Sequence, residues 1–124
     1  IYNITENKDK FNFVIDSLNN ILKRESNKKI LITAEYNQIL EYIKEVLKDN
    51  YDIDIYKKKY NDIKNKINLI SINYLKKNII NNVDILIFFT FSGKAYQKYL
   101  EIKSIYNDYY LNKIKFYLFN YNKN

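Results

Sequence analysis

The sequence predicts an α/β domain in which helices cover both faces of a mostly parallel sheet, forming a three-layer α/β/α sandwich. Helical and strand-like patterns alternate along the 124 residues, as they do in parallel α/β domains. Residues 83–90, VDILIFFT, are almost all apolar, which is typical of a parallel strand covered on both faces. Hydrophobic residues make up 47% of the chain and no Gly/Ser linker divides it, so we expect one domain over residues 1–124. The sequence does not begin with Met, and we expect the domain to belong to a longer protein.

The first half of the chain contains two helical and two strand-like segments. Residues 9–24 place apolar side chains at helical spacing and predict an amphipathic helix. Residues 29–34, KILITA, are rich in β-branched side chains and predict a buried strand. Residues 37–50 predict a second helix, and the alternating run YDIDIY at residues 51–56 predicts a second strand.

The predicted helix over residues 37–50 combines one apolar face with charged side chains elsewhere. Asn37 is in position to cap its N-terminus. Glu41 and Glu45 each have a lysine within one turn, the spacing of helical ion pairs. The apolar face consists of Ile39, Leu40, Ile43, Val46 and Leu47.

The second half begins with a polar, lysine-rich segment, residues 57–66, which predicts a loop. Residues 67–80 fit either a strand followed by a helix or one irregular helix, and the pattern leaves both open. Residues 93–111 predict a helix and residues 113–121 a final strand. The helical pattern after residue 93 is carried by Tyr96, Tyr99, Leu100, Ile102, Lys103 and Tyr106.

The composition excludes several classes of site. The absence of cysteine excludes disulfides and thiolate nucleophiles, and the absence of histidine removes the commonest general base and metal ligand. No run of about 18 apolar residues predicts a membrane span, so we expect a cytoplasmic domain with no membrane partner. The net charge of +7 is compatible with an anionic partner such as nucleic acid, but it is equally the lysine usage of an AT-rich genome.

The single glycine, Gly93, stands where the strand over residues 83–90 gives way to a helix. In parallel α/β sheets, ligands bind at the carboxyl ends of the strands. Glycine there permits a sharp turn and close approach of an anion to the first N–H groups of the helix. Thr90 and Ser92 offer hydroxyls, and Lys94 adds positive charge, so this loop is a candidate phosphate site. The competing interpretation is that Gly93 only makes a tight turn and Ser92 only caps the helix.

The run VDILIFFTFSGKA resembles the signature of sugar isomerase (SIS) domains, in which a strand preceded by Asp ends in Ser-x-Ser-Gly-x-Thr. Thr90, Ser92 and Gly93 match this pattern, and Ala95 stands where the family usually has Thr or Ser. The upstream run DSLNNILKRESNKKILITAEYNQILEYI is similar to the first helix and strand of SIS domains in the RpiR type of sugar-responsive transcription regulators. The resemblance extends over residues 9–122.

The first loop departs from this family pattern. The first strand of SIS domains normally runs into Gly-x-Gly-x-Ser, which also holds the sugar phosphate. Ala34, Tyr36 and Gln38 occupy these positions here. The resemblance therefore places Ala34 and Gln38 in a phosphate loop that has lost part of its motif. Tyr36, in place of the second glycine, would crowd the phosphate pocket.

The resemblance implies a flavodoxin-type SIS fold and a sugar-phosphate-sensing or dimerisation module of a transcription regulator. It implies a phosphorylated sugar or amino sugar as ligand, no cofactor, and a homodimer whose DNA contacts come only from a separate domain. Thr90, Ser92, Gly93, Lys94 and Ala95 would form the better preserved part of the phosphate site.

A second resemblance gives the alternative. KKILITAEYNQILEYIKEVLK is similar to the opening strand and helix of the second lobe of superfamily 2 helicases, and NNVDILIFF is similar to a later strand. An active lobe needs arginines near its end for the ATP γ-phosphate. The only arginine is Arg24, and Gln97 and Lys98 are a faint echo of the arginine-rich motif. The resemblance therefore implies a degenerate lobe without its own ATPase activity.

Two further function classes remain. Lysines 57–59, 66, 76 and 77, with neighbouring tyrosines, are candidates for direct nucleic-acid binding or form a solvated face. For an enzyme, Glu35 at the end of the first predicted strand is a candidate carboxylate. Glu101 lies well inside the helix after Gly93, too far from the loop, and neither residue belongs to a catalytic constellation. We therefore expect no enzymatic activity.

Overall fold

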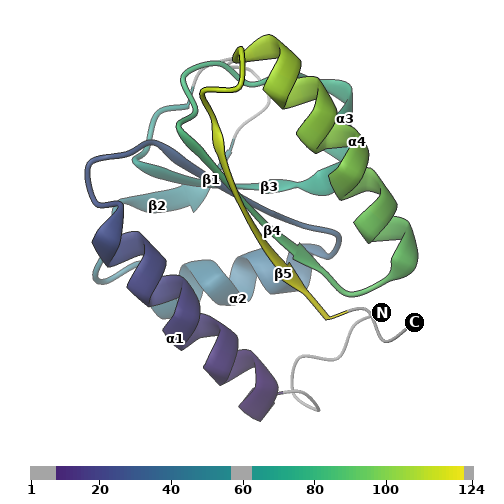
Figure 1. Cartoon of the computed structure of the whole chain (residues 1–124). Helices are drawn as coiled ribbons and strands as arrows, with labels where there is room; N and C mark the ends of the chain where they lie inside the picture. The colour runs from purple at the N-terminus through teal and green to yellow at the C-terminus, as the bar shows by residue number, and fades with distance from the viewer. Residues whose placement is uncertain (1–7, 57–62, 122–124) are drawn as a thin grey trace.

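The computed structural model describes residues 8–56 and 63–121, which form one five-stranded, all-parallel sheet with helices on both faces (Figure 1). The strand order is β2-β3-β1-β4-β5. The predicted fold class is confirmed. The elements are α1 (Lys8–Arg24), β1 (Ile30–Ala34), α2 (Asn37–Leu47), β2 (Ile53–Ile55), β3 (Ile67–Ser71), α3 (Ile72–Lys77), β4 (Ile85–Thr90), α4 (Gly93–Tyr109) and β5 (Lys115–Asn120).

β1 lies at the centre of the sheet and pairs with β3 on one side and β4 on the other. All five of its residues are buried, as are all six of β4. Strands that are covered on both faces need apolar side chains in both directions, which is why ILITA and ILIFFT lack polar alternation. Each such strand contributes side chains to two separate cores.

The two faces of the sheet are covered by different pairs of helices. Figure 1 shows α1 and α2 on one side and α3 and α4 on the other. Leu18 of α1 and Ile43 of α2 pack with Ile32 of β1 in the first core. Ile102 of α4 packs with Leu86 of β4 in the second. Burial of these side chains is the main term that stabilises the sandwich.

The segment that the sequence left open, residues 67–80, is a strand followed directly by a short helix, β3 and α3. Ser71 ends the strand and caps the helix, because its Oγ accepts a hydrogen bond from the N–H of Tyr74 at 3.3 Å. Ser71 is therefore both the last residue of β3 and the N-cap of α3. Because no loop separates the two elements, the apolar pattern of residues 67–80 shows no clear boundary. Residues 57–62 of the predicted loop lie outside the described part of the chain.

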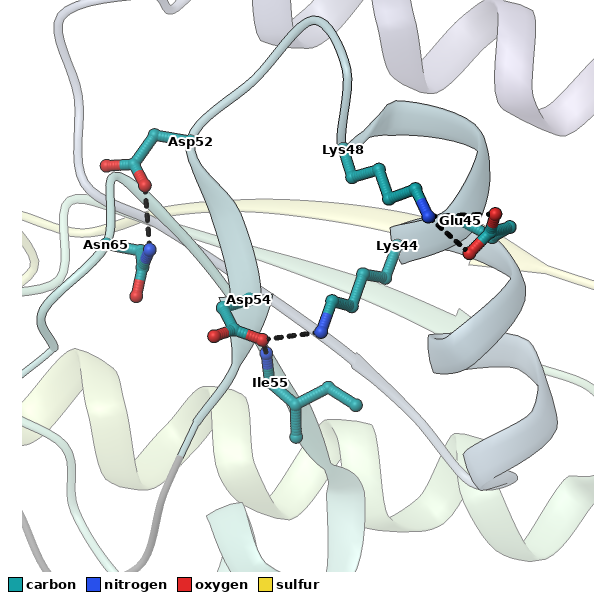
Figure 2. Close-up of polar contacts among 7 residues, drawn as sticks. All are labelled: Lys44, Glu45, Lys48, Asp52, Asp54, Ile55 and Asn65. Atoms are coloured by element: carbon teal, nitrogen blue, oxygen red, sulfur yellow. Dashed lines mark hydrogen bonds and ion pairs between the residues drawn. The ribbon is translucent and has the colours of Figure 1, made fainter.

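Three details predicted for α2 are wrong. Asn37 is the first helical residue, and the N-cap position belongs to Tyr36, whose side chain makes no capping bond. Val46 is 40% exposed rather than part of the buried face. Lys44 pairs with Asp54 of β2 at 2.8 Å and not with Glu41, whereas Glu45 does pair with Lys48 (Figure 2).

The buried stripe of α4 also differs from the predicted pattern. Leu100 is 42% exposed, because it lies on the side of the helix that points away from the sheet. The residues that pack against β4 recur at intervals of three or four and are Ala95, Tyr99, Ile102 and Tyr106.

Tyr106 anchors the end of α4 to the loop that follows α3. Its hydroxyl accepts a hydrogen bond from the N–H of Ile80 at 2.8 Å and donates one to the carbonyl of Asn78 at 3.1 Å. The ring is buried, and this burial raises the pKa of the phenol. The hydroxyl thus satisfies two backbone groups of the α3–β4 connection.

We expect Tyr106→Phe to lower the free energy of unfolding by about 1–3 kcal/mol, because a buried N–H and a carbonyl lose their partner. Urea unfolding followed by circular dichroism measures this change. Tyr109→Phe is the matched control, since Tyr109 is 50% exposed and its hydroxyl donates to a side chain, Asn81, and not to the backbone. Equal effects of the two substitutions would contradict the anchoring role of Tyr106.

Candidate functional site

The order of the strands creates two crevices at the carboxyl edge of the sheet. The helix after β1, α2, lies on one face, whereas the helices after β3 and β4 lie on the other. Ligand sites of open α/β sheets occur where the connections of neighbouring strands leave in opposite directions. β1 has such a neighbour on each side, so one crevice lies between β1 and β4 and the other between β1 and β3.

The crevice between β1 and β4 is closed by the carboxylate of Glu35. This residue directly follows β1. One of its oxygens accepts a hydrogen bond from the N–H of Phe91 at 2.5 Å, and the other accepts one from the hydroxyl of Ser92 at 2.7 Å. The Ser92 oxygen in turn accepts a bond from the N–H of Ala95 at 3.1 Å and so caps α4. The Glu35 carboxylate thereby accepts from the two donors that directly precede α4.

The residues predicted to bind phosphate are gathered at this edge of the sheet. Thr90 is buried and donates its hydroxyl hydrogen bond to Asn120 Oδ1 of β5 at 3.0 Å, away from the loop. Ser92 donates to Glu35, as described above. Lys94 is exposed and Ala95 is buried in the first turn of α4. The hydroxyls of Thr90 and Ser92 thus both have internal acceptors.

Gly93 opens α4 without a left-handed backbone conformation. The glycine has no positive φ, whereas Asn82, Leu111 and Asn112 do, with φ values of 64°, 54° and 62°. The conformational freedom of glycine is therefore not required at residue 93, and Ser92 supplies the cap. Both observations agree with the interpretation of this loop as a capped strand-to-helix turn.

The two predicted residues of the first loop do not reach the Ser92 loop through any hydrogen bond within the described residues. Ala34 is fully buried at the end of β1, and Gln38 is exposed in the first turn of α2. The residue that joins the two loops is Glu35, which the sequence marked only as a carboxylate near the strand end. The signal for its role was its position directly after β1, opposite the N–H and hydroxyl donors that follow β4.

On the β3 side of the sheet there is a pocket of about 320 Å³ where α2, α3 and the ends of β2 and β3 meet. The pocket is lined by Asn37, Leu40, Glu41, Ile55, Tyr56, Leu69, Ile70, Ser71 and Tyr74. Its volume is at the lower end of the range of small-molecule sites.

Other kinds of site are not found in the part of the chain that the structure describes. Residues 8–56 and 63–121 contain no group of three acidic side chains placed to hold a metal ion. Within the same ranges, none of the helices combines the length and the apolar character that a bilayer crossing needs.

We expect Gly93→Ala to leave the fold intact and to raise the free energy of unfolding by about 0.4–1 kcal/mol, since Ala suits a helical position and restricts the unfolded chain. Thermal and urea denaturation measure this change. A clear loss of stability would contradict this expectation. It would show that residue 93 must lack a side chain because another part of the backbone approaches it closely.

We expect Glu35→Ala to lower the free energy of unfolding by about 1–3 kcal/mol, because the N–H of Phe91 and the hydroxyl of Ser92 lose their acceptor. These N–H and hydroxyl groups should then donate to phosphate oxygens, so phosphate should raise the melting temperature of this variant more than that of the unchanged protein. Glu41→Ala is the matched control, because it removes an exposed glutamate with the same charge. A phosphate effect of equal size in all three proteins would contradict the closure of this crevice by Glu35.

Comparison with known proteins yields fold neighbours only. No protein-family model matches the chain. No curated protein sequence matches it either. Among solved structures, the chain is similar to the C-terminal part of the Fun30 ATPase domain, with a TM-score of 0.59 and 14% identity over 85% of this chain and 40% of that one. It is also similar to the Hef helicase domain of Pyrococcus furiosus, with a TM-score of 0.55 and 11% identity over 94% of this chain and 27% of that one.

The chain thus spans less than half the length of either neighbour. At these identities the likeness establishes the α/β fold, which these ATPase and helicase domains share with the chain.

Proposed function

We propose that this domain is a lobe of the helicase ATPase type that binds nucleic acid and does not hydrolyse ATP itself. The observation that carries the proposal is the all-parallel sheet in the order β2-β3-β1-β4-β5, which resembles the C-terminal part of an ATPase domain and a helicase domain. Two stretches of the sequence, around β1–α2 and around β4, independently resemble the second lobe of superfamily 2 helicases.

The absence of suitable arginines supports a lobe without ATPase activity. The single arginine, Arg24, ends α1 before the start of β1, at the opposite edge of the sheet from the two crevices. Its guanidinium donates a hydrogen bond to the hydroxyl of Tyr117 in β5 at 3.0 Å. Lys98 of α4 is one of the two residues that faintly resemble the arginine-rich motif, and its ammonium group donates a hydrogen bond to Asn73 of α3. No arginine is therefore placed to stabilise the charge of a transferred phosphoryl group.

The sugar-phosphate-sensing role has less support. Its predicted site would use the hydroxyls of Thr90 and Ser92 as donors, and these are bonded to Asn120 and Glu35. A phosphate in the same crevice would also meet the negative charge of that carboxylate. Phosphate binding would therefore require the Glu35 carboxylate to move out of the crevice. The Glu35→Ala variant removes this carboxylate and tests the requirement.

A basic surface at the amino edge of the sheet supports nucleic-acid binding. The segments that precede β3, β1, β4 and β5 lie side by side in this order. The N–H of Ile30 bonds to the Lys66 carbonyl, the N–H of Asp84 to the Lys29 carbonyl, and the N–H of Lys115 to the Asp84 carbonyl. Their basic side chains gather at one end of the molecule. Five lysines of this edge make no ion pair within the described residues. We call them the amino-edge lysines: Lys23, Lys28, Lys29, Lys66 and Lys113.

Acidic side chains at this edge are held by internal bonds. Asp52 accepts hydrogen bonds from the Asn65 amide (Figure 2) and from the N–H of Lys66. These bonds, with the charges of Lys29 and Lys66, hold the pKa of Asp52 below its usual range. Asp84 accepts from the N–H of Lys29 at 2.8 Å.

The lysines named from the sequence are distributed differently. Lys66 belongs to the amino edge, whereas Lys76 is paired with Glu101 at 2.7 Å and Lys77 is exposed at the end of α3. Lysines 57–59 lie outside the described residues.

We expect the protein to bind a fluorescent single-stranded oligonucleotide with an affinity that falls steeply with salt, because lysine–phosphate contacts release counterions. Lys28→Glu/Lys113→Glu should weaken binding and lower the slope of log affinity against log salt by roughly 0.7 per lost contact. Fluorescence anisotropy over a salt series measures both quantities.

The control is Lys77→Glu/Lys94→Glu, which changes the net charge equally through exposed lysines elsewhere. Equal losses in the two double variants would contradict a localised site at the amino edge. ATP turnover above background, with or without oligonucleotide, would contradict the non-catalytic part of the proposal.

A further inference from the structure

The turn that joins α4 to β5 exposes large side chains at the amino edge of the sheet (Figure 1). Tyr109, the last residue of α4, is 50% exposed, and Leu111 is 74% exposed. Leu111 is the most exposed of the large apolar side chains that the structure describes. Ile105 lies one turn before Tyr109 on the same side of α4 and is also exposed. Exposed apolar surface thus gathers around the end of this helix, and such surface often marks a binding site.

The backbone of this turn is in a conformation that leucine disfavours. Leu111 has a φ of 54°, in the left-handed region, where the Cβ of a bulky residue crowds the following carbonyl oxygen. Glycine or asparagine usually occupies the left-handed position after a helix. The chain has asparagine at the other two left-handed positions of the described residues, Asn82 and Asn112. The leucine at residue 111 therefore gains neither relaxed backbone geometry nor burial, which indicates a role for its side chain at the surface.

The ring of Tyr109 is held in place although the residue is half exposed. Its hydroxyl donates a hydrogen bond to the Asn81 side chain, in the loop before β4. Its ring meets that of Tyr110 edge to face, with the centroids 5.1 Å apart and the ring planes at 74°. A tyrosine ring that is already fixed in one orientation can stack on an unpaired base with little further loss of side-chain entropy.

The turn is continuous with the basic surface of the amino edge. Lys113, one of the amino-edge lysines, belongs to the turn itself. The next segment bonds to Asp84 through the N–H of Lys115, and the Asp84 side chain accepts from the N–H of Lys29. The exposed carboxylate of Asp108 opposes the attraction of phosphates at one end of the turn. Positive charge and apolar surface are thus neighbours here, and this combination matches a strand that carries both phosphates and exposed base faces.

We propose that Tyr109 and Leu111 contact the unpaired bases of a single-stranded nucleic acid whose phosphates bind the amino-edge lysines. The Tyr109 ring stacks on one base, and the Leu111 side chain packs against the apolar face of a neighbouring base. The inference rests on the nucleic-acid binding proposed above and adds a chemical preference to it. A strand with exposed bases binds more tightly than an equally charged backbone without bases.

An anionic membrane also presents negative charge beside apolar material. The fixed ring of Tyr109 favours the nucleic acid, because stacking on a base requires a ring held in one orientation, whereas contact with lipid chains does not. The membrane is therefore an outcome that the experiment must separate from the proposal.

The experiment compares two fluorescent strands of equal length and charge, an oligothymidylate and an abasic strand, by fluorescence anisotropy over a salt series. We expect the oligothymidylate to bind at least about fivefold more tightly, with the same dependence on salt, because base stacking adds to equal phosphate contacts. Equal affinities would overturn the contact with bases and leave the basic surface in place. No binding of either strand would overturn both this inference and the proposed function.

Two substitutions of Tyr109 locate the stacking. Tyr109→Ala removes the ring and should abolish the preference for the oligothymidylate, while the affinity for the abasic strand stays unchanged. Tyr109→Phe keeps the ring and should keep the preference. A preference that survives in Tyr109→Ala, or that is lost equally in both variants, would overturn the stacking role.

A matched pair of leucine variants tests Leu111. Leu111→Asn suits the left-handed backbone, so it should not lower the melting temperature, yet it should weaken binding of the oligothymidylate. Leu100→Asn removes another exposed leucine, in the middle of α4, and should leave that affinity unchanged. Equal affinities of the two variants would contradict the role of Leu111. Sedimentation with vesicles of phosphatidylserine and phosphatidylcholine tests the membrane. Vesicle binding that Leu111→Asn abolishes, without any preference for bases, would overturn the proposal.

Discussion

The direction in which the chain leaves its central strand constrains everything at the carboxyl edge of the domain. β1 continues into a helix on one face of the sheet, whereas both of its neighbours continue into helices on the other. The connection that follows β1 therefore diverges from the connections that follow β3 and β4. The backbone N–H donors at these strand ends then need hydrogen-bond partners or solvent. An all-parallel sheet with buried central strands leaves few alternatives, because both faces must carry helices.

The two crevices meet this constraint in different ways. Beside β4, the Glu35 carboxylate bonds to Phe91 and Ser92 and ties the ends of two central strands together. Beside β3, the Glu41 carboxylate makes no hydrogen bond or ion pair within the described residues, and the nearby Lys44 pairs with Asp54. Two glutamates six positions apart thus have different roles: Glu35 bonds to the neighbouring loop, and Glu41 lines a pocket.

The sequence predicted the layers of the fold more successfully than the site. Apolar runs such as ILITA and ILIFFT, and the helical stripe of α1, depend on local periodicity, which a single chain displays directly. The bond between Glu35 and Ser92 spans 57 positions and arises only when β1 and β4 pair, so no local pattern contains it. Exposure of Val46 and Leu100 was missed for a related reason, since apolar character alone does not say which side of a helix meets the sheet.

The backbone amide of Phe91 reports most directly on whether the chain's own Glu35 carboxylate closes the β1–β4 crevice. Hydrogen exchange and the chemical shift of this amide should be measured in the unchanged protein with and without phosphate. If Glu35 is its acceptor, the amide exchanges slowly, resonates downfield and does not respond to phosphate. An amide that exchanges as fast as an exposed loop and shifts on addition of phosphate would show that the crevice is open to an external anion and that Glu35 does not close it.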